Sequence, residues 1–296
     1  MGKTVIFSTG AKGGVGKSTM AIVMIEALRE AGVRVSGIEG DEHSPSLHRK
    51  YDGTIDIADI DLAALFGEEG VELFNEAVNS LPDGYIVVNT PASGSRMFDE
   101  IPGILRSAAW ETRATWCLAI KPDRSCDGVN EDGLFESLER GMLSGVSNGG
   151  VTVVRPLFQE AYRGQKFWYD SYQEMAKQIG LREMTMKKLP SKIFDAVSRD
   201  RRSIPELITD FSNIDPLTGA NMALIWHGLK KSLAETVLVE EPILVGDVVS
   251  KTNSIRIYGV GGIAEAMRGN GMVPVHDSQG TDSQVTDAVV KGGGKK

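Results

Sequence analysis

The feature that most constrains the fold of this chain is a glycine-rich turn between an apolar segment and a helical one. Residues 3–8 are typical of a buried strand, and a helix is predicted over residues 18–31, ending at Gly32. Gly13, Gly14 and Gly16 lie between them. Glycines leave backbone N–H groups open at a helix N-terminus, where they bind phosphate. The sequence therefore predicts a phosphate-binding loop in an α/β unit.

The order of residues in this turn matches the pattern G-x-x-x-x-G-K-[ST] except at its first glycine. Gly16, Lys17 and Ser18 fit as written, whereas Ala11 stands at the first position. A second lysine, Lys12, precedes the glycines. The alternative is a chance match in a protein that binds no nucleotide, but the strand before the loop and the helix after it are what phosphate binding requires.

Strand and helix signals continue to alternate beyond this unit. Further strands are predicted over residues 33–38, 85–89, 114–120 and 151–154, and helices over residues 71–80 and 221–237. Ser203 and Glu206 form a capping box with Pro205 between them, so a helix is expected to begin there. The repeating order predicts an α/β fold with a doubly wound, mainly parallel sheet and helices on both faces.

The C-terminal part of the chain has a different composition. From about Glu240 it mixes a short strand-like segment, residues 254–259, with glycine and serine, and it ends in three glycines and two lysines. The sequence predicts one domain over residues 1–240 and a partly disordered C-terminal extension over residues 241–296.

Bulk properties exclude several classes of protein. A length of 296 residues with 41% hydrophobic content allows a sizeable core. Apolar stretches such as residues 19–28 are interrupted well short of the ~18 residues that a membrane helix needs. No secretory signal precedes the first strand, and Cys117 and Cys126 are expected to be reduced thiols. We expect a cytoplasmic protein without a transmembrane segment.

Residues 12–19 resemble the deviant phosphate loop (deviant Walker A) of the ParA/MinD family of P-loop ATPases. The resemblance extends in order and spacing over roughly the first 240 residues. It implies a sheet of the P-loop NTPase type and ATP and Mg²⁺ as cofactors. The residues that would cradle the phosphates are Gly13, Gly14, Val15, Gly16, Lys17, Ser18 and Thr19.

The resemblance also assigns individual roles within this loop. Lys17 would contact the β- and γ-phosphates, the Ser18 hydroxyl would bind Mg²⁺, and Thr19 would meet the α-phosphate. Lys12 would reach across a nucleotide-sandwich dimer to the partner's phosphates and neutralise charge in trans, as an arginine finger does. ATP-dependent homodimerisation is therefore expected.

Two further motifs follow later strands. Glu39 and Asp41 stand where the family has D-x-D, so Asp41 is the expected water-orienting carboxylate; the alternative is a solvated acidic loop. Residues 89–92 resemble the family's D-x-P-A segment, but Asn89 replaces the aspartate that holds Mg²⁺ through water. The Asn89 carbonyl still accepts a hydrogen bond from metal-bound water but brings no charge, so weaker metal binding and slower turnover are expected.

The cysteines and histidines are further candidates for a site. Cys117 and Cys126 invite comparison with the related nitrogenase iron-protein branch, but the loop after Asn89 contains no cysteine, so both thiols are expected to be structural. His43 and His48 are expected to be solvated and to have no role. No zinc spacing is present among the four histidines.

The densest basic region has two interpretations: a surface for non-specific DNA, as in ParA-type members, or the solvated faces of amphipathic helices. Its residues are Lys187, Lys188, Lys192, Arg199, Arg201 and Arg202. A net charge of −8 argues against a uniformly basic surface. The glycine-rich terminus does not supply the basic membrane helix of MinD-type members, so membrane binding is not expected.

The resulting functional hypothesis is an ATPase switch that dimerises on ATP and positions DNA or a protein cargo, with a protein activator. Residues 167–171 and 189–191 look similar to the plasmid mobilisation and conjugal-transfer branch. The alternative is a nucleotide-gated scaffold with little hydrolysis, which Asn89 favours. A metabolic enzyme that transfers phosphate to a small substrate is a third class, in which Lys12 has no evident task.

Overall fold

The computed structural model describes residues 2–92, 96–100, 103–118, 133–146, 149–156, 176–187 and 189–238. The chain divides into two units, Met1–Val249 and Ser250–Lys296, and the fold below is that of the first. The predicted extension over residues 241–296, with its strand at residues 254–259, lies outside the described residues. The predicted domain limit near residue 240 stays a prediction.

A seven-stranded sheet with the order β3-β2-β4-β1-β5-β6-β7 forms the centre of the unit, and every neighbouring pair is parallel. The chain runs from β1 outward to β2 and β3, returns to β4, and then passes over β1 to β5, β6 and β7. The strands are β1 (Lys3–Thr9), β2 (Val35–Glu39), β3 (Ile57–Asp59), β4 (Gly84–Asn89), β5 (Glu111–Cys117), β6 (Val151–Pro156) and β7 (Arg182–Met186). This reversal of direction between β4 and β1 is the topological switch point at which such sheets bind ligands.

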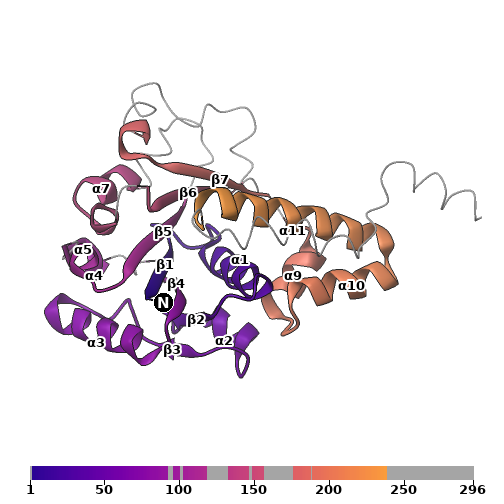
Figure 1. Cartoon of the computed structure of the whole chain (residues 1–296), viewed down its shortest axis with the longest axis horizontal. Helices are drawn as coiled ribbons and strands as arrows, with labels where there is room; N and C mark the ends of the chain where they lie inside the picture. Colours follow the sequence, from indigo (N-terminus) through magenta and orange to yellow (C-terminus); the bar gives the residue numbers. More distant parts are fainter. Residues whose placement is uncertain are drawn as a thin grey trace, which may run out of the picture. The chain divides into compact units, whose positions relative to one another are not determined.

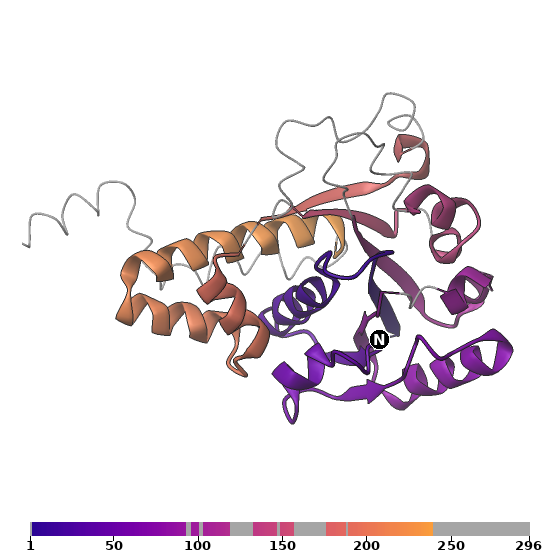
Figure 2. The same cartoon turned by 180° about the vertical axis from the view of Figure 1, so that it is seen from behind.

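Helices cover both faces of the sheet, as the sequence predicted (Figure 1). One face carries α1 (Lys17–Glu30), α2 (Ser46–Tyr51), α9 (Ser191–Arg199), α10 (Ile204–Ile214) and α11 (Pro216–Thr236). The other carries α3 (Gly67–Ser80), α4 (Arg96–Glu100), α5 (Gly103–Ser107), α7 (Leu134–Glu139) and the 3₁₀ turn η1 (Met142–Gly145). Figure 2 shows α10 and α11 side by side as a hairpin.

Alternation along the central strands supplies a core on each face. In β1, Ile6 belongs to the cluster under α1, whereas Val5 and Phe7 belong to the cluster under α3. β4 alternates in the same way, with Val87 on the α1 side and Val88 on the opposite side. Successive strand side chains point to opposite faces, and both faces are covered, so these strands read as continuous apolar runs.

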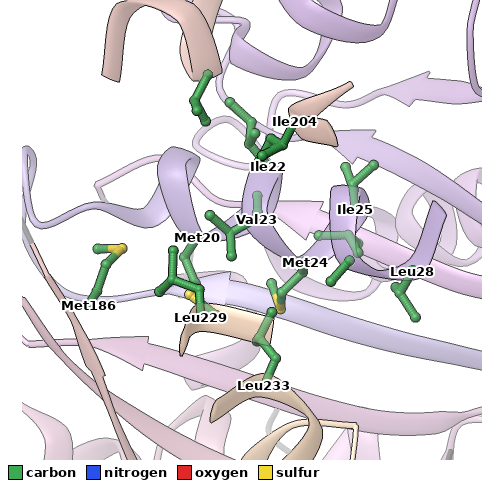
Figure 3. Close-up of a cluster of buried hydrophobic side chains, with 14 of the residues drawn as sticks. Met20, Ile22, Val23, Met24, Ile25, Leu28, Met186, Ile204, Leu229 and Leu233 are labelled. Carbon is green, nitrogen blue, oxygen red and sulfur yellow. The ribbon is translucent and has the colours of Figure 1, made fainter. Parts of the chain in front are cut away.

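The helix α1 is buried along most of its length, from Met20 to Leu28 (Figure 3). Figure 3 shows its apolar side chains in one cluster with Leu229 and Leu233 of α11 and Met186 of β7. Polar contacts join the same partners: the Tyr51 hydroxyl donates to the Ile22 carbonyl, and the Ile204 N–H donates to the Glu26 carboxylate. The helix that follows the glycine-rich loop is therefore held by α2, α10 and α11.

Most predicted elements are present with shifted ends. The capping box at Ser203 and Glu206 forms as predicted, and α1, β1, β4 and β6 lie within one or two residues of their predicted limits. β5 begins earlier, at Glu111, and ends at Cys117, while residues 119–120 lie outside the described residues. The short elements α2, β3, β7 and α9 were not predicted from the sequence.

A buried lysine joins α2 to the segment before α10. Lys50 is fully buried, and its Nζ donates to the backbone carbonyls of Asp200 and Arg202 at 3.0 and 3.1 Å. Burial lowers the pKa of Lys50 from its usual value, and the nearby Glu26 carboxylate opposes that change. The hydrogen bonds between this ammonium group and the two carbonyl oxygens take the place of those that water would otherwise make to them.

Replacing this lysine is expected to destabilise the fold. Lys50→Met leaves the Asp200 and Arg202 carbonyls without their donor, which should lower the free energy of unfolding by about 1–3 kcal/mol in urea titrations followed by circular dichroism. Lys231→Met is the matched control, because the Lys231 side chain is 66% exposed and its loss should cost at most about 0.5 kcal/mol. Equal losses in the two variants would refute a structural role for Lys50.

Candidate functional site

A cavity of about 730 Å³ opens at the carboxyl edge of the sheet. Its walls come from the loops that follow β1, β2, β4 and β7, which the parallel topology brings to one edge. The lining residues are Gly13, Gly14, Gly16, Lys17, Ser18, Thr19, Asp41, Ser44, Thr90, Ala92, Met186, Lys187, Leu189, Ser191 and Phe194. Residues from all three predicted motifs are thus gathered around one space.

Contacts with the core and with β1 hold the glycine-rich loop in position. Val15 is buried in the core under α1, and the Ser8 hydroxyl donates to the Lys17 carbonyl at 2.7 Å. Gly16 is the N-terminal cap of α1 and has a φ of 102°, a left-handed conformation that favours glycine. The first turn of α1, with Ser18 and Thr19, therefore points its backbone N–H groups at the cavity, as anion binding requires.

The two lysines of the loop occupy different environments. Lys17 is 7% exposed and lines the cavity, and its Nζ donates to the Lys12 carbonyl at 2.6 Å. Lys12 is exposed and its side chain is not part of the cavity wall. Lys17 is thus placed to act within its own site, whereas Lys12 faces outward.

Asp41 lies in a short turn on the β2 side of the cavity. Its Oδ1 accepts a hydrogen bond from the Ser44 N–H at 3.1 Å, and its own N–H donates to Glu39 Oε1 at 3.2 Å. Among the described residues its other carboxylate oxygen has no hydrogen-bond partner. Asp41 therefore presents a carboxylate to the cavity from a turn with defined geometry.

Glu39 and Asn89 form a buried polar pair behind that turn. The Asn89 Nδ2 donates to Glu39 Oε1 at 2.7 Å, and the Leu47 N–H donates to Glu39 Oε2 at 2.7 Å. Burial raises the pKa of Glu39, and the hydrogen bonds from Leu47, Asn89 and Asp41 act in the opposite direction. Asn89 is wholly buried, and its Oδ1 has no hydrogen-bond partner among the described residues.

The residues around this pair fit a Mg²⁺ ion that arrives with a nucleotide. Ser18 lines the cavity, and the unpaired Asn89 Oδ1 is a buried acceptor of the kind that a metal-bound water satisfies. Mg²⁺ in such sites keeps several waters and few protein ligands. No cluster of three or more histidine, cysteine or acidic side chains suited to a metal occurs in the described part of the chain.

The wall opposite the glycine-rich loop was missed by the sequence analysis. Met186 ends β7, Leu189 follows it, and Phe194 in α9 is 44% exposed, so these apolar groups face the cavity. Lys187 and Ser191 add a cation and a hydroxyl. The similarity of residues 189–191 to the mobilisation branch is the one signal in the sequence that falls on this wall.

The basic region is partly neutralised within the chain. Arg201 forms an ion pair with Asp52, and Arg202 pairs with Asp200 and Asp210. Lys188 lies outside the described residues. The positive charge in this region is therefore smaller than the sequence suggests.

The remaining candidates are the two cysteines and two of the histidines. Cys117 is buried at the end of β5, and Cys126 lies outside the described residues. His48 contacts Asp59 through its ring, so it is partnered rather than simply solvated. His43 is exposed.

Comparison with known protein families agrees with this geometry. Residues 6–214 match the family described as the CobQ/CobB/MinD/ParA nucleotide binding domain. The chain belongs to this family. The match begins within β1 and ends with α10, so it includes the end of β1, the strands β2 to β7 and the whole wall of the cavity.

Individual known proteins are similar to this chain at low identity. Protein MobD from Acidithiobacillus ferrooxidans is 23% identical over 241 residues, which is 81% of this chain and 100% of that protein. The structure of pnob8 ParA is 14% identical with a TM-score of 0.49, over 81% of this chain and 100% of that chain. A chain of the MinC:MinD cell division protein complex of Aquifex aeolicus is 19% identical with a TM-score of 0.43, over 70% of this chain and 89% of that chain.

Family membership makes this chain a nucleotide-binding domain of the ParA/MinD type. The structure adds one observation on membranes: among the helices of the described residues, none combines the length and apolar character needed to span a bilayer.

Proposed function

We propose that this member of the CobQ/CobB/MinD/ParA family is an ATP-dependent dimerising switch that hydrolyses ATP. The observation that carries the proposal is the convergence of the glycine-rich loop, Asp41 and the segment after Asn89 on one cavity, with Lys12 exposed beside it. Hydrolysis needs a cradle for the phosphates, a cation beside them and a carboxylate that orients water. This cavity contains a residue of each kind.

The proposed roles follow from where each side chain lies. The backbone N–H groups from Gly13 to Thr19 hold the phosphates, and Lys17 exchanges its bond to the Lys12 carbonyl for one to the β- and γ-phosphates. Asp41 orients a water in line with the γ-phosphate. Ser18 and, through water, Asn89 would hold Mg²⁺, which would offset phosphate charge when bound.

The partner and cargo are proposed from the family resemblance. The similarity to MobD favours the mobilisation and conjugal-transfer branch over other members, with DNA or a protein as cargo and a protein activator. A DNA contact would use exposed cations of the basic region, such as Lys192 and Arg199, which form no ion pair with any of the described residues. Such binding would weaken with salt, because it depends on phosphate neutralisation.

Steady-state ATP hydrolysis with Mg²⁺ tests the proposal, with and without duplex DNA and with Lys17→Ala as the background. Turnover above that background supports an ATPase, and stimulation by DNA supports a DNA-positioning one. Tight ATP binding without turnover in either condition would contradict the proposal that this protein hydrolyses ATP.

Asn89 favours a second function, a nucleotide-gated scaffold with little hydrolysis. A neutral amide stands where the family has an aspartate, so the site has less charge to offset that of Mg²⁺ and its waters. A scaffold would dimerise on ATP and stay dimeric. Release of the dimer in step with phosphate production separates the two functions.

Lys12→Ala is expected to keep ATP binding and to lose ATP-dependent dimerisation. Lys12 is exposed and lies outside the cavity wall, so its side chain contributes to another site more readily than to its own. Size-exclusion chromatography with light scattering in the presence of ATPγS and Mg²⁺ measures the change. Lys231→Ala, another exposed lysine, is the control, and unchanged dimerisation of Lys12→Ala would refute the role in trans.

A further inference from the structure

Glu39 and Asn89 end neighbouring strands and are aligned across them. Glu39 in β2 pairs in register with Asn89 in β4, and Asn89 pairs in turn with Ser8 in β1, the strand that leads into the glycine-rich loop. The preceding residues, Ile38 and Val88, face the core under α3, so Glu39 and Asn89 project to the face covered by α1. Asn89 thus lies between a carboxylate and the phosphate loop.

The hydrogen bonds of Glu39 determine which way the Asn89 amide is turned. The Glu39 carboxylate accepts from the N–H groups of Asp41 and Leu47 and from Asn89 Nδ2. A carboxylate that accepts from donors only is matched by its ionised form, and it selects the NH₂ side of the amide. The carbonyl Oδ1 of Asn89 is therefore turned away from Glu39.

That carbonyl oxygen lacks a donor. Asn89 Oδ1 is buried and has no hydrogen-bond partner among the described residues. A buried polar group without a partner is costly, so this oxygen marks a place where a ligand supplies a donor. The waters around a Mg²⁺ ion held by Ser18 are donors of this kind.

We propose that Glu39 is a positioning residue for the Mg²⁺ site: it orients the Asn89 amide and supplies, one strand away, the negative charge that position 89 lacks. The proposal rests on the proposed function, because Mg²⁺ arrives with the nucleotide. Glu39 and Asn89 then act as one unit. The Asn89 amide contacts a metal-bound water, and the Glu39 carboxylate makes the amide oxygen a stronger hydrogen-bond acceptor. Carboxylates that orient a metal-binding group in this way raise metal affinity.

The test is the Mg²⁺ dependence of ATPγS affinity, measured on the full chain by calorimetry from EDTA to excess MgCl₂. The Glu39→Gln variant is expected to need at least about tenfold more Mg²⁺ than the wild type for the same gain in ATPγS affinity. Its ATPγS affinity in EDTA should be unchanged. Glu42→Gln is the matched control: it removes a nearby carboxylate that is exposed and does not line the cavity, and it is expected to keep the wild-type Mg²⁺ dependence.

A double variant moves the carboxylate from β2 to β4. In Glu39→Gln/Asn89→Asp the hydrogen bond across the strands is retained with its direction reversed, so Mg²⁺ dependence near wild type is expected. This variant carries the test alone if Glu39→Gln does not fold. A double variant as impaired as Glu39→Gln would overturn the proposal.

The remaining outcomes separate this proposal from the proposed function. Glu39→Gln with the wild-type Mg²⁺ dependence would overturn the role of Glu39 alone. An equal shift in Glu42→Gln would do the same, because the loss of any negative charge near this turn would then account for both variants. Absence of ATPγS binding by the wild-type chain at every Mg²⁺ concentration would overturn the proposed function and this inference together.

Discussion

Lys17→Ala is expected to weaken ATP binding by about 100-fold or more. The Lys17 side chain is 7% exposed and lines the cavity at the start of α1, so it offers a cation that is already largely withdrawn from water. Charge-assisted bonds from such a cation to phosphate are among the strongest polar contacts. Calorimetry with ATPγS and Mg²⁺ measures the loss.

The fold of the Lys17→Ala variant should remain intact. Alanine is favourable inside a helix, and the contacts that place the loop, from Ser8 to the Lys17 carbonyl and from Val15 to the core, do not use the lysine side chain. Lys12→Ala is the matched control within the same loop and should bind ATPγS like the wild type. Tight binding by Lys17→Ala in a folded protein would contradict the assignment of the cavity as a nucleotide site.

Asp41→Asn is expected to lower the rate of ATP hydrolysis by about 100- to 1,000-fold while ATP affinity stays the same. Asparagine keeps the side-chain oxygen that accepts from the Ser44 N–H, so the turn is preserved and only the charge and basicity are lost. Single-turnover hydrolysis at saturating ATP and Mg²⁺ measures the chemical step.

Glu42→Gln is the control for this experiment, because Glu42 is the next residue, is exposed and does not line the cavity. Its hydrolysis rate should match the wild type. Equal rates for Asp41→Asn and the wild type would remove Asp41 from the mechanism and support a site that binds ATP without using this carboxylate.

The central part of the fold was predictable because its elements carry their signals locally. β1 and β4 are buried on both faces and read as continuous apolar runs, and α1 is bounded by Gly16 and Gly32, both with positive φ. β7 was missed because its sequence, Arg-Glu-Met-Thr-Met, has two buried side chains among polar ones at the edge of the sheet. Such a strand is specified by the neighbour that it pairs with rather than by its own residues.

The candidate site, too, was predictable only in part. Asp41 and Asn89 were expected at one edge of the sheet because the carboxyl ends of parallel strands meet there. The wall formed by Met186, Leu189 and Phe194 was not expected, since nothing in these residues indicates that the chain returns to the glycine-rich loop after β7. The bond between Glu39 and Asn89 depends on strand register, which the sequence does not reveal.

The burial of α1 limits which parts of the site are free to respond to a nucleotide. This helix is enclosed by apolar side chains, and its outer end is held by Glu30, which accepts hydrogen bonds from Trp226 and Lys230 of α11. Closely packed interiors resist small displacements, so the phosphate end of α1 acts as a fixed reference point. For the proposed switch, we therefore expect the difference between nucleotide states at the turn around Asp41 and at Thr90 and Ala92, which line the cavity outside α1.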